Sequence, residues 1–163
     1  MPGYVIHLAI AKKHIEINGI KNAEKFIKGT IDPDILKQQG IDSHYGYSNN
    51  PNFKEFFEEH SLQTDYNRGY FLHLATDYLF YNKFLDKWDP SIYEDYSILN
   101  RRLVERYGIE IPEEIKKDAE FKEGKLSILE YDSVIEFIET TAKIPLEEII
   151  KRKLISLQEV DRI

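Results

Sequence analysis

An imidazole and a carboxylate lie four residues apart in the otherwise apolar run GYFLHLATDYLF at residues 69–80. Positions i and i+4 share one face of a helix, so His73 and Asp77 are expected to project side by side. Apolar side chains occupy most of the remaining circumference, which is typical of a helix buried in a core. An ionised Asp is stable there only if it is paired or binds a metal, and His is the commonest metal ligand. The pattern therefore predicts a metal site, and its alternative is a structural Asp–His hydrogen bond or an Asp paired with an Arg from another helix.

The composition limits which metal sites and which partners the chain can have. Its 163 residues suit one domain that buries a core without disulfides or a structural metal. Cys is absent, so any metal must be held by nitrogen and oxygen ligands. The formal net charge of -7 opposes binding to duplex nucleic acid but permits binding of a small phosphoester. No apolar stretch approaches the roughly 20 residues of a transmembrane segment, and no signal peptide is evident, so we expect a cytoplasmic protein.

The hydrophobic pattern is helical almost throughout and predicts one all-α domain over residues 1–163. The Asp-Pro-Asp sequence predicts a turn at residues 30–34, because the residue before proline is pushed out of the helical region. Residues 40–52 are rich in Gly, Ser, Asn and Tyr and predict a loop. We expect the metal ligands within residues 1–80, supported by helices within residues 90–156. The predicted helices cover residues 4–17, a short stretch ending at 28–29, and residues 51–59, 65–85, 92–107, 112–121, 132–142 and 145–155.

All five His residues precede Asp77, which restricts the candidate ligands to the first half of the chain. His7 lies among apolar residues of the first predicted helix and is expected to face inward. His44 lies in the predicted polar loop, and Asp34 lies on the predicted Asp-Pro-Asp turn. Each of these signals has an ordinary structural explanation, but together they supply three imidazoles and two carboxylates, enough for a two-metal centre with one bridging carboxylate. The predicted metal ligands are His7, Asp34, His44, His73 and Asp77.

Four further residues near this series have lesser predicted roles. Lys37 could face a substrate phosphate, although a solvated surface Lys is the plainer interpretation. Tyr45 could line the cleft by stacking, or it could be a packing residue. His14 lies on nearly the same helix face as His7 and is a reserve ligand, with an exposed position as the stronger expectation. His60 is expected at the surface.

The runs MPGYVIHLAIAKK, FIKGTIDPDI, SHY and GYFLHLATDYLF resemble the zinc-dependent phospholipase C family, an all-α group related to single-strand nucleases with a trinuclear zinc site. The similarity covers roughly the first half of the chain and depends on the order of the ligands. It implies that His44, His73 and Asp77 hold one metal. It also implies that Asp77 bridges to a second metal bound by His7, and that Asp34 is a ligand or the general base. Secreted phospholipases have a further His, His and Glu set downstream, whereas no His follows Asp77 here. The resemblance therefore implies two zinc ions in a reduced, intracellular member of the group.

Two functional hypotheses follow from these ligands. The leading one is a metal-dependent phosphoester hydrolase that acts on a small phosphoester or a lipid head group, with water activated by a di-metal His/Asp centre. The alternative is a non-catalytic metal-binding helical module with a regulatory or interaction role; the two differ in whether a coordination position stays open to water. A hydrolase built on adjacent His-Asp pairs is disfavoured, because no such dipeptide occurs. Iron or manganese are alternatives to zinc, since His/Asp sites accept all three.

Overall fold

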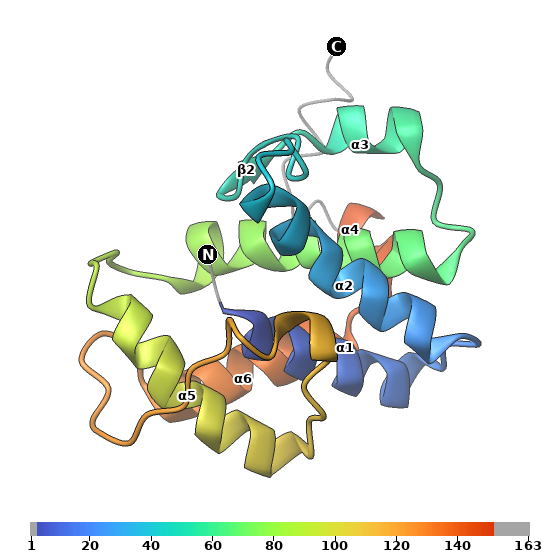
Figure 1. Cartoon of the computed structure of the whole chain (residues 1–163). Coiled ribbons are helices and arrows are strands. Elements are labelled where there is room, and N and C mark those ends of the chain that lie inside the picture. The colour runs from blue at the N-terminus through green and yellow to red at the C-terminus, as the bar shows by residue number, and fades with distance from the viewer. Residues whose placement is uncertain (1–2, 152–163) are drawn as a thin grey trace.

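Seven α-helices make up most of residues 3–151, the part of the chain that the computed structural model describes (Figure 1). This architecture confirms the prediction of a single all-α domain. Strands β1 (Gly46–Tyr47) and β2 (Asn50–Pro51) form one small antiparallel hairpin. The helices are α1 (Tyr4–Asn18), α2 (Ala23–Gln38), α3 (Phe53–Glu59), α4 (Asp65–Leu79), α5 (Ile92–Tyr107), α6 (Tyr131–Lys143) and α7 (Leu146–Lys151), with a π-helical turn η1 (Phe80–Phe84) and a 3-10 turn η2 (Glu113–Ile115). Within residues 3–151, no helix combines the length and the apolar character needed to cross a membrane.

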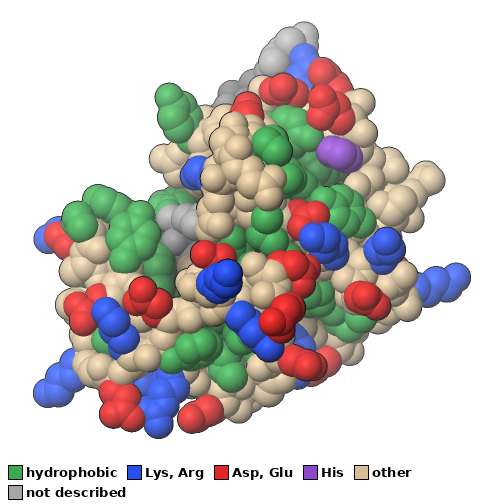
Figure 2. Space-filling view, in the orientation of Figure 1, with side chains coloured by type: hydrophobic (Ala, Val, Ile, Leu, Met, Phe, Trp, Pro, Cys, Tyr) green, Lys and Arg blue, Asp and Glu red, His purple; other side chains and the backbone are tan. Residues whose placement is uncertain are grey.

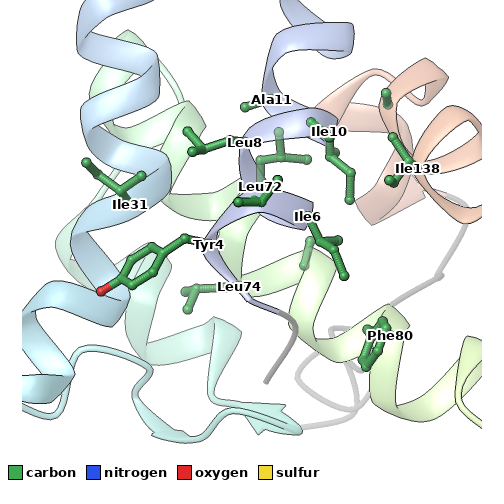
Figure 3. Packing of buried hydrophobic residues seen from close by; sticks show 14 of the residues in the cluster. Tyr4, Ile6, Leu8, Ile10, Ala11, Ile31, Leu72, Leu74, Phe80 and Ile138 are labelled. Carbon is green, nitrogen blue, oxygen red and sulfur yellow. The ribbon is translucent and has the colours of Figure 1, made fainter. Parts of the chain in front are cut away.

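Helix α1 lies in the middle of the core and is buried on nearly all sides along its first two turns (Figure 3). It packs against α2, α4, α5 and α6. Val5, Ala9 and Ile10 have no exposed surface. A helix that is apolar around its whole circumference belongs inside a larger assembly of helices, which explains this central place. His7, on the same buried turns, is therefore held in the interior.

Helices α2 and α4 cross at two glycines that bring their backbones together (Figure 1). A Cβ atom on Gly29 would lie 2.0 Å from the backbone oxygen of Tyr66, and one on Gly69 would lie 2.0 Å from the backbone oxygen of Phe26. Neither position has room for a side chain. The crossing aligns the following turns of the two helices, so that Asp34 and Asp77 face the same space.

Substitution of Gly69 with Ala is expected to lower the free energy of unfolding by about 3 kcal/mol, because overpacking forces the two backbones apart. Urea unfolding followed by circular dichroism measures this loss. Gly3→Ala is the matched control, since its Cβ would make only ordinary contact with Tyr96 at 3.6 Å. A Gly69→Ala protein as stable as the control would show that the close approach of α2 and α4 contributes little.

The predicted turn at residues 30–34 is wrong, because α2 continues through Pro33 to Gln38. A proline inside a helix removes one hydrogen-bond donor and costs about 3 kcal/mol. Residues 29–34 are all buried, and their packing against α4 and α1 outweighs that local cost. Asp34 is therefore fixed on a helix rather than on a turn, which gives it a more rigid position than the sequence predicted.

Three other predicted elements differ from the structure in extent. The predicted helix at residues 112–121 is wrong: only η2 forms there, and Ile115 is the only buried residue of that segment. An isolated short helix is marginal in water unless an apolar face packs against other elements. The predicted helix at 65–85 ends at Leu79 and continues as η1. The predicted helix at 145–155 begins as α7, and its last residues lie outside the described part of the chain.

Candidate metal centre

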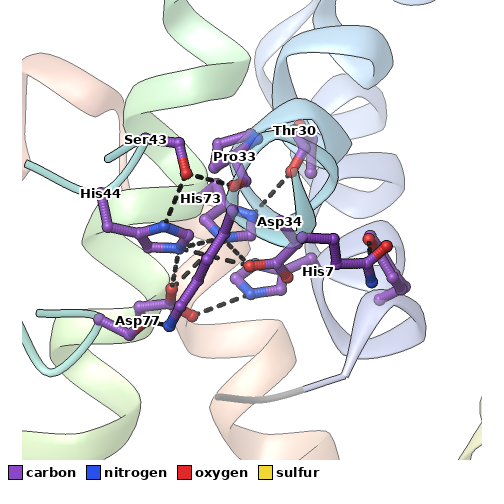
Figure 4. Close-up of polar contacts among 12 residues, drawn as sticks. His7, Thr30, Pro33, Asp34, Ser43, His44, His73 and Asp77 are labelled. Carbon is purple, nitrogen blue, oxygen red and sulfur yellow. Dashed lines mark hydrogen bonds and ion pairs between the residues drawn. The ribbon is translucent and has the colours of Figure 1, made fainter. Parts of the chain in front are cut away.

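Side chains from three helices and one loop meet in the interior, around one small space (Figure 4). Helix α1 supplies one of them, α2 another, the loop before β1 a third, and α4 the remaining two. Each is at most 1% exposed. The structure thus brings together all five residues that the sequence singled out, although they span 70 positions. They are His7, Asp34, His44, His73 and Asp77.

Four of these side chains point ligand atoms at one another with almost equal separations. His44 Nε2 lies 3.2 Å from His73 Nε2, 3.1 Å from Asp77 Oδ2 and 3.3 Å from Asp34 Oδ1. His73 Nε2 lies 3.3 Å from Asp34 Oδ1 and 3.2 Å from Asp77 Oδ2. In a tetrahedral shell with metal–ligand bonds of about 2.0–2.1 Å, neighbouring ligand atoms are about 3.3 Å apart. The five distances therefore match the edges of a shell that could hold a metal ion.

The main chain orients the His73 ring. Its Nδ1 atom lies 2.7 Å from the backbone oxygen of Thr30. A carbonyl oxygen only accepts hydrogen bonds, so Nδ1 carries the proton and the Nε2 atom of the neutral ring presents a lone pair to the centre. Metal-binding His residues usually have such a second hydrogen bond, which fixes the tautomer. The sequence could not have indicated this contact. Every residue has a backbone carbonyl group, so no residue type marks the one that His73 reaches.

Asp34 provides a test of whether these residues fit a metal. Both of its carboxylate oxygens are buried and neither has a hydrogen-bond partner. The rings of His44 and His73 lie 3.3 Å from Oδ1 without the alignment of a hydrogen bond. A buried carboxylate without hydrogen bonds is costly, and a cation between the four ligand atoms would supply a closer contact to Asp34 than the two rings do. The cluster therefore fits a divalent metal ion.

His7 lies beside this group of four rather than within it. Its Nε2 atom is 2.9 Å from Asp77 Oδ1, and its ring stacks on His73 with a centroid separation of 3.7 Å. Asp77 thus faces His7 with one oxygen and the group of four with the other. Burial and the neighbouring charge of His73 lower the pKa of His7, so the neutral ring donates its Nε2 hydrogen to Asp77 when no metal is bound.

The charges of the cluster compensate one another in the absence of a metal. Burial alone would lower the pKa of His73, but the carboxylates of Asp34 and Asp77 outweigh it and raise that pKa to about 10. The same carboxylates raise the pKa of His44 against the effect of burial. Burial raises the pKa of both carboxyls, yet the neighbouring His residues hold each of them below its usual value. A metal ion would replace the protons on the rings, since only neutral imidazoles bind metal.

The two predicted substrate-binding residues make their hydrogen bonds outside the cluster. Lys37 is exposed, and its Nζ atom donates to the hydroxyl of Ser48 at 2.9 Å. The hydroxyl of Tyr45 donates to Glu59 at 2.8 Å and lies 2.9 Å from Nε2 of His60, so it points toward α3. Both side chains have partners away from the five cluster residues, and their roles in substrate binding stay predictions. His60 is half-buried under Tyr45, rather than fully at the surface as expected.

His14 differs from both of its predicted roles. It is 1% exposed, so the expectation of an exposed His is wrong. Its Nδ1 atom donates to the backbone oxygen of Ala142 at 3.0 Å, and its ring stacks on Phe26. Seven residues are nearly two full turns of helix, or about 10 Å along its axis, so His14 lies farther along α1 and meets the end of α6 instead of the cluster. It is a structural contact between α1 and the end of α6.

The surface shows how enclosed the cluster is. Acidic and basic side chains are interspersed over the face in Figure 2, and His is almost absent from it. A hollow of about 930 Å³ lies between the end of α4, η1 and α6, but none of the five cluster residues lines it. Each of the five cluster residues is at most 1% exposed, so the cluster lies beneath the surface and outside this hollow.

Comparison of the chain with protein-family models, with curated proteins and with solved structures found no match. Its function is therefore inferred from the residues of the cluster and their geometry.

Proposed function

We propose that this protein is a metal-dependent phosphoester hydrolase that acts on a small phosphoester or a lipid head group. One observation carries the proposal: four buried ligand atoms have the spacing of a metal shell, and the carboxylate of Asp34 in that shell accepts no hydrogen bond. Zinc suits the His and Asp ligands, with iron or manganese as alternatives. The resemblance of the ligand order to zinc-dependent phospholipase C supports the same reaction class.

The residues divide into two groups around Asp77. Asp34, His44, His73 and one oxygen of Asp77 would hold the first ion; His7 and the other oxygen of Asp77 would contribute to the second. Bound divalent cations would supply Lewis-acid chemistry, which polarises a phosphoryl oxygen and makes water a better nucleophile. Two dications exceed the charge of the two carboxylates, and the remaining positive charge suits an anionic phosphoester.

Asp34 is the residue proposed to move a proton. Its low pKa keeps the carboxylate ionised near neutral pH, although burial opposes this. Its Oδ2 atom has no hydrogen-bond donor, so it can accept a proton from an attacking water molecule. A general base placed in this way typically contributes about 10²–10⁴-fold to the rate.

A non-catalytic metal-binding module is the second candidate, and a specific observation favours it. Four ligands already complete a tetrahedral shell, and each of them is at most 1% exposed. Closed four-ligand shells are typical of structural zinc, whereas catalytic sites keep one position for water. Both candidates predict bound metal, and they predict opposite results for hydrolysis.

Metal analysis together with a substrate panel tests both candidates. The purified protein, loaded with Zn²⁺, Mn²⁺ or anaerobic Fe²⁺, is dialysed and its metal per chain is measured. Hydrolysis of phosphomonoesters, phosphodiesters and phosphatidylcholine is then followed with and without a chelator. We expect at least one ion per chain and chelator-sensitive hydrolysis of at least one ester. A metal-loaded protein that hydrolyses nothing would leave the binding module as the function, and a protein that retains no metal would reject both.

A further inference from the structure

The residue immediately before His44 connects that ring to helix α2 (Figure 4). Ser43 is 3% exposed. Its Oγ atom lies 2.5 Å from the backbone oxygen of Pro33 and 3.2 Å from Nδ1 of His44. Its own carbonyl accepts a hydrogen bond of 2.6 Å from the hydroxyl of Tyr70, on α4. The residue thus contacts α2 and α4, two of the three helices that supply the cluster.

The direction of these hydrogen bonds is fixed by the chemistry of their ends. The Pro33 carbonyl can only accept, so the Ser43 hydroxyl gives its single hydrogen to that oxygen. The Oγ lone pairs are then the only group left to face Nδ1 of His44. That nitrogen must carry a hydrogen to make a favourable contact. In the neutral ring Nε2 is therefore unprotonated, and its lone pair points to His73, Asp34 and Asp77.

The hydrogen bond between Ser43 and Pro33 also fixes the position of His44 relative to α2. Pro33 directly precedes Asp34 on α2, so the Ser43 hydroxyl joins the loop ligand to the turn of helix that carries another cluster residue. The hydrogen bond from Tyr70 holds the same residue against α4. Displacement of Ser43 would move His44 relative to both helices.

We propose that Ser43 is a positioning residue of the metal centre: its hydroxyl holds His44 in the Nδ1-protonated tautomer and anchors the loop to the carbonyl of Pro33. This inference rests on the proposed function, in which His44 binds metal through Nε2. Ser43 itself would contact neither the metal nor the substrate.

Two variants test the role of the hydroxyl. Ser43→Ala removes it and is expected to weaken zinc affinity about 10–100-fold in competition with a chromogenic chelator, the usual effect of losing a hydrogen bond to a ligand. Ser43→Thr keeps the hydroxyl and is expected to restore most of the affinity. Ser48→Ala is the matched control: it removes the hydroxyl of a half-buried Ser between β1 and β2, which contacts Lys37 outside the cluster, and it should bind zinc as the wild type does. Zinc affinity of Ser43→Ala equal to that of the control would overturn the proposal.

Nitrogen NMR of the His44 ring, in metal-free protein at a pH where the ring is neutral, gives a readout that does not depend on metal binding. We expect a protonated Nδ1 in the wild type and in Ser43→Thr, and a mixture of tautomers in folded Ser43→Ala. An unchanged tautomer in Ser43→Ala would refute the role of the hydroxyl. If the wild type bound no zinc, the proposed function would fail, and the ring spectra would still decide whether Ser43 fixes the tautomer.

Discussion

Replacement of Asp77 with Asn is expected to remove nearly all retained metal, with a loss of affinity of at least about 100-fold. Asp77 presents Oδ2 to His44 and His73 and Oδ1 to His7, so it contacts every ring of the cluster. The amide keeps the shape of the side chain but has no charge to offset a buried cation. Loss of one charged partner from a buried pair costs about 3–5 kcal/mol, and about 1.4 kcal/mol corresponds to tenfold in affinity. Metal per chain after dialysis measures the effect.

Asp95→Asn is the matched control, because it also neutralises a fully buried carboxylate. Asp95 accepts hydrogen bonds of 2.8–2.9 Å from the backbone N–H groups of Ser127, Ile128 and Leu129, away from the cluster. Its amide variant should lose thermal stability and keep its metal. Equal loss of metal from both variants would mean that general destabilisation, rather than the missing carboxylate, is responsible.

Local rules were sufficient for the part of the site that lies on one helix. The i, i+4 spacing places His73 and Asp77 on one face of α4, and the structure has them 3.2 Å apart. The apolar surroundings of His7 correctly predicted its burial. Both inferences need only the helical period and the neighbouring residues, so they do not depend on how the helices pack.

The remaining parts of the site depend on contacts between elements that are distant in the sequence. The rule that proline ends a helix failed at Pro33, because burial of α2 against α4 outweighs the cost of a missing donor. The apolar pattern at 112–121 predicted a helix, but Ile115 alone finds a place in the core. His14 was expected to be exposed, yet the end of α6 covers it. In each case, contacts with distant parts of the chain determined the helix boundary or the burial of the side chain. Such contacts cannot be predicted from the neighbouring residues of a single sequence.

The chemistry of Asp34 can be separated from its ligand role by an isosteric substitution. Asp34→Asn is expected to lower turnover at least about 100-fold, the contribution of a well-placed general base, while metal content falls by less than about half, since three other ligands and the amide oxygen remain. Turnover is measured on the ester that responds best in the substrate panel and is expressed per bound ion. This normalisation separates the chemical step from metal loss.

The neighbouring Asp32 provides the control for that substitution. It lies two residues away on α2, and its carboxylate is bound by Lys28 at 2.9 Å and by the hydroxyl of Tyr66 at 2.6 Å, outside the cluster. Asp32→Asn should therefore keep both metal and turnover within about twofold of the wild type, in line with the small effect of a partly exposed ion pair. If Asp34→Asn instead loses metal and turnover in parallel, Asp34 acts first as a ligand. Without the bound ion there would be no activated water molecule for a general base to deprotonate. If it keeps both, the free oxygen of Asp34 takes no part in proton transfer, and another group must accept the proton of the attacking water.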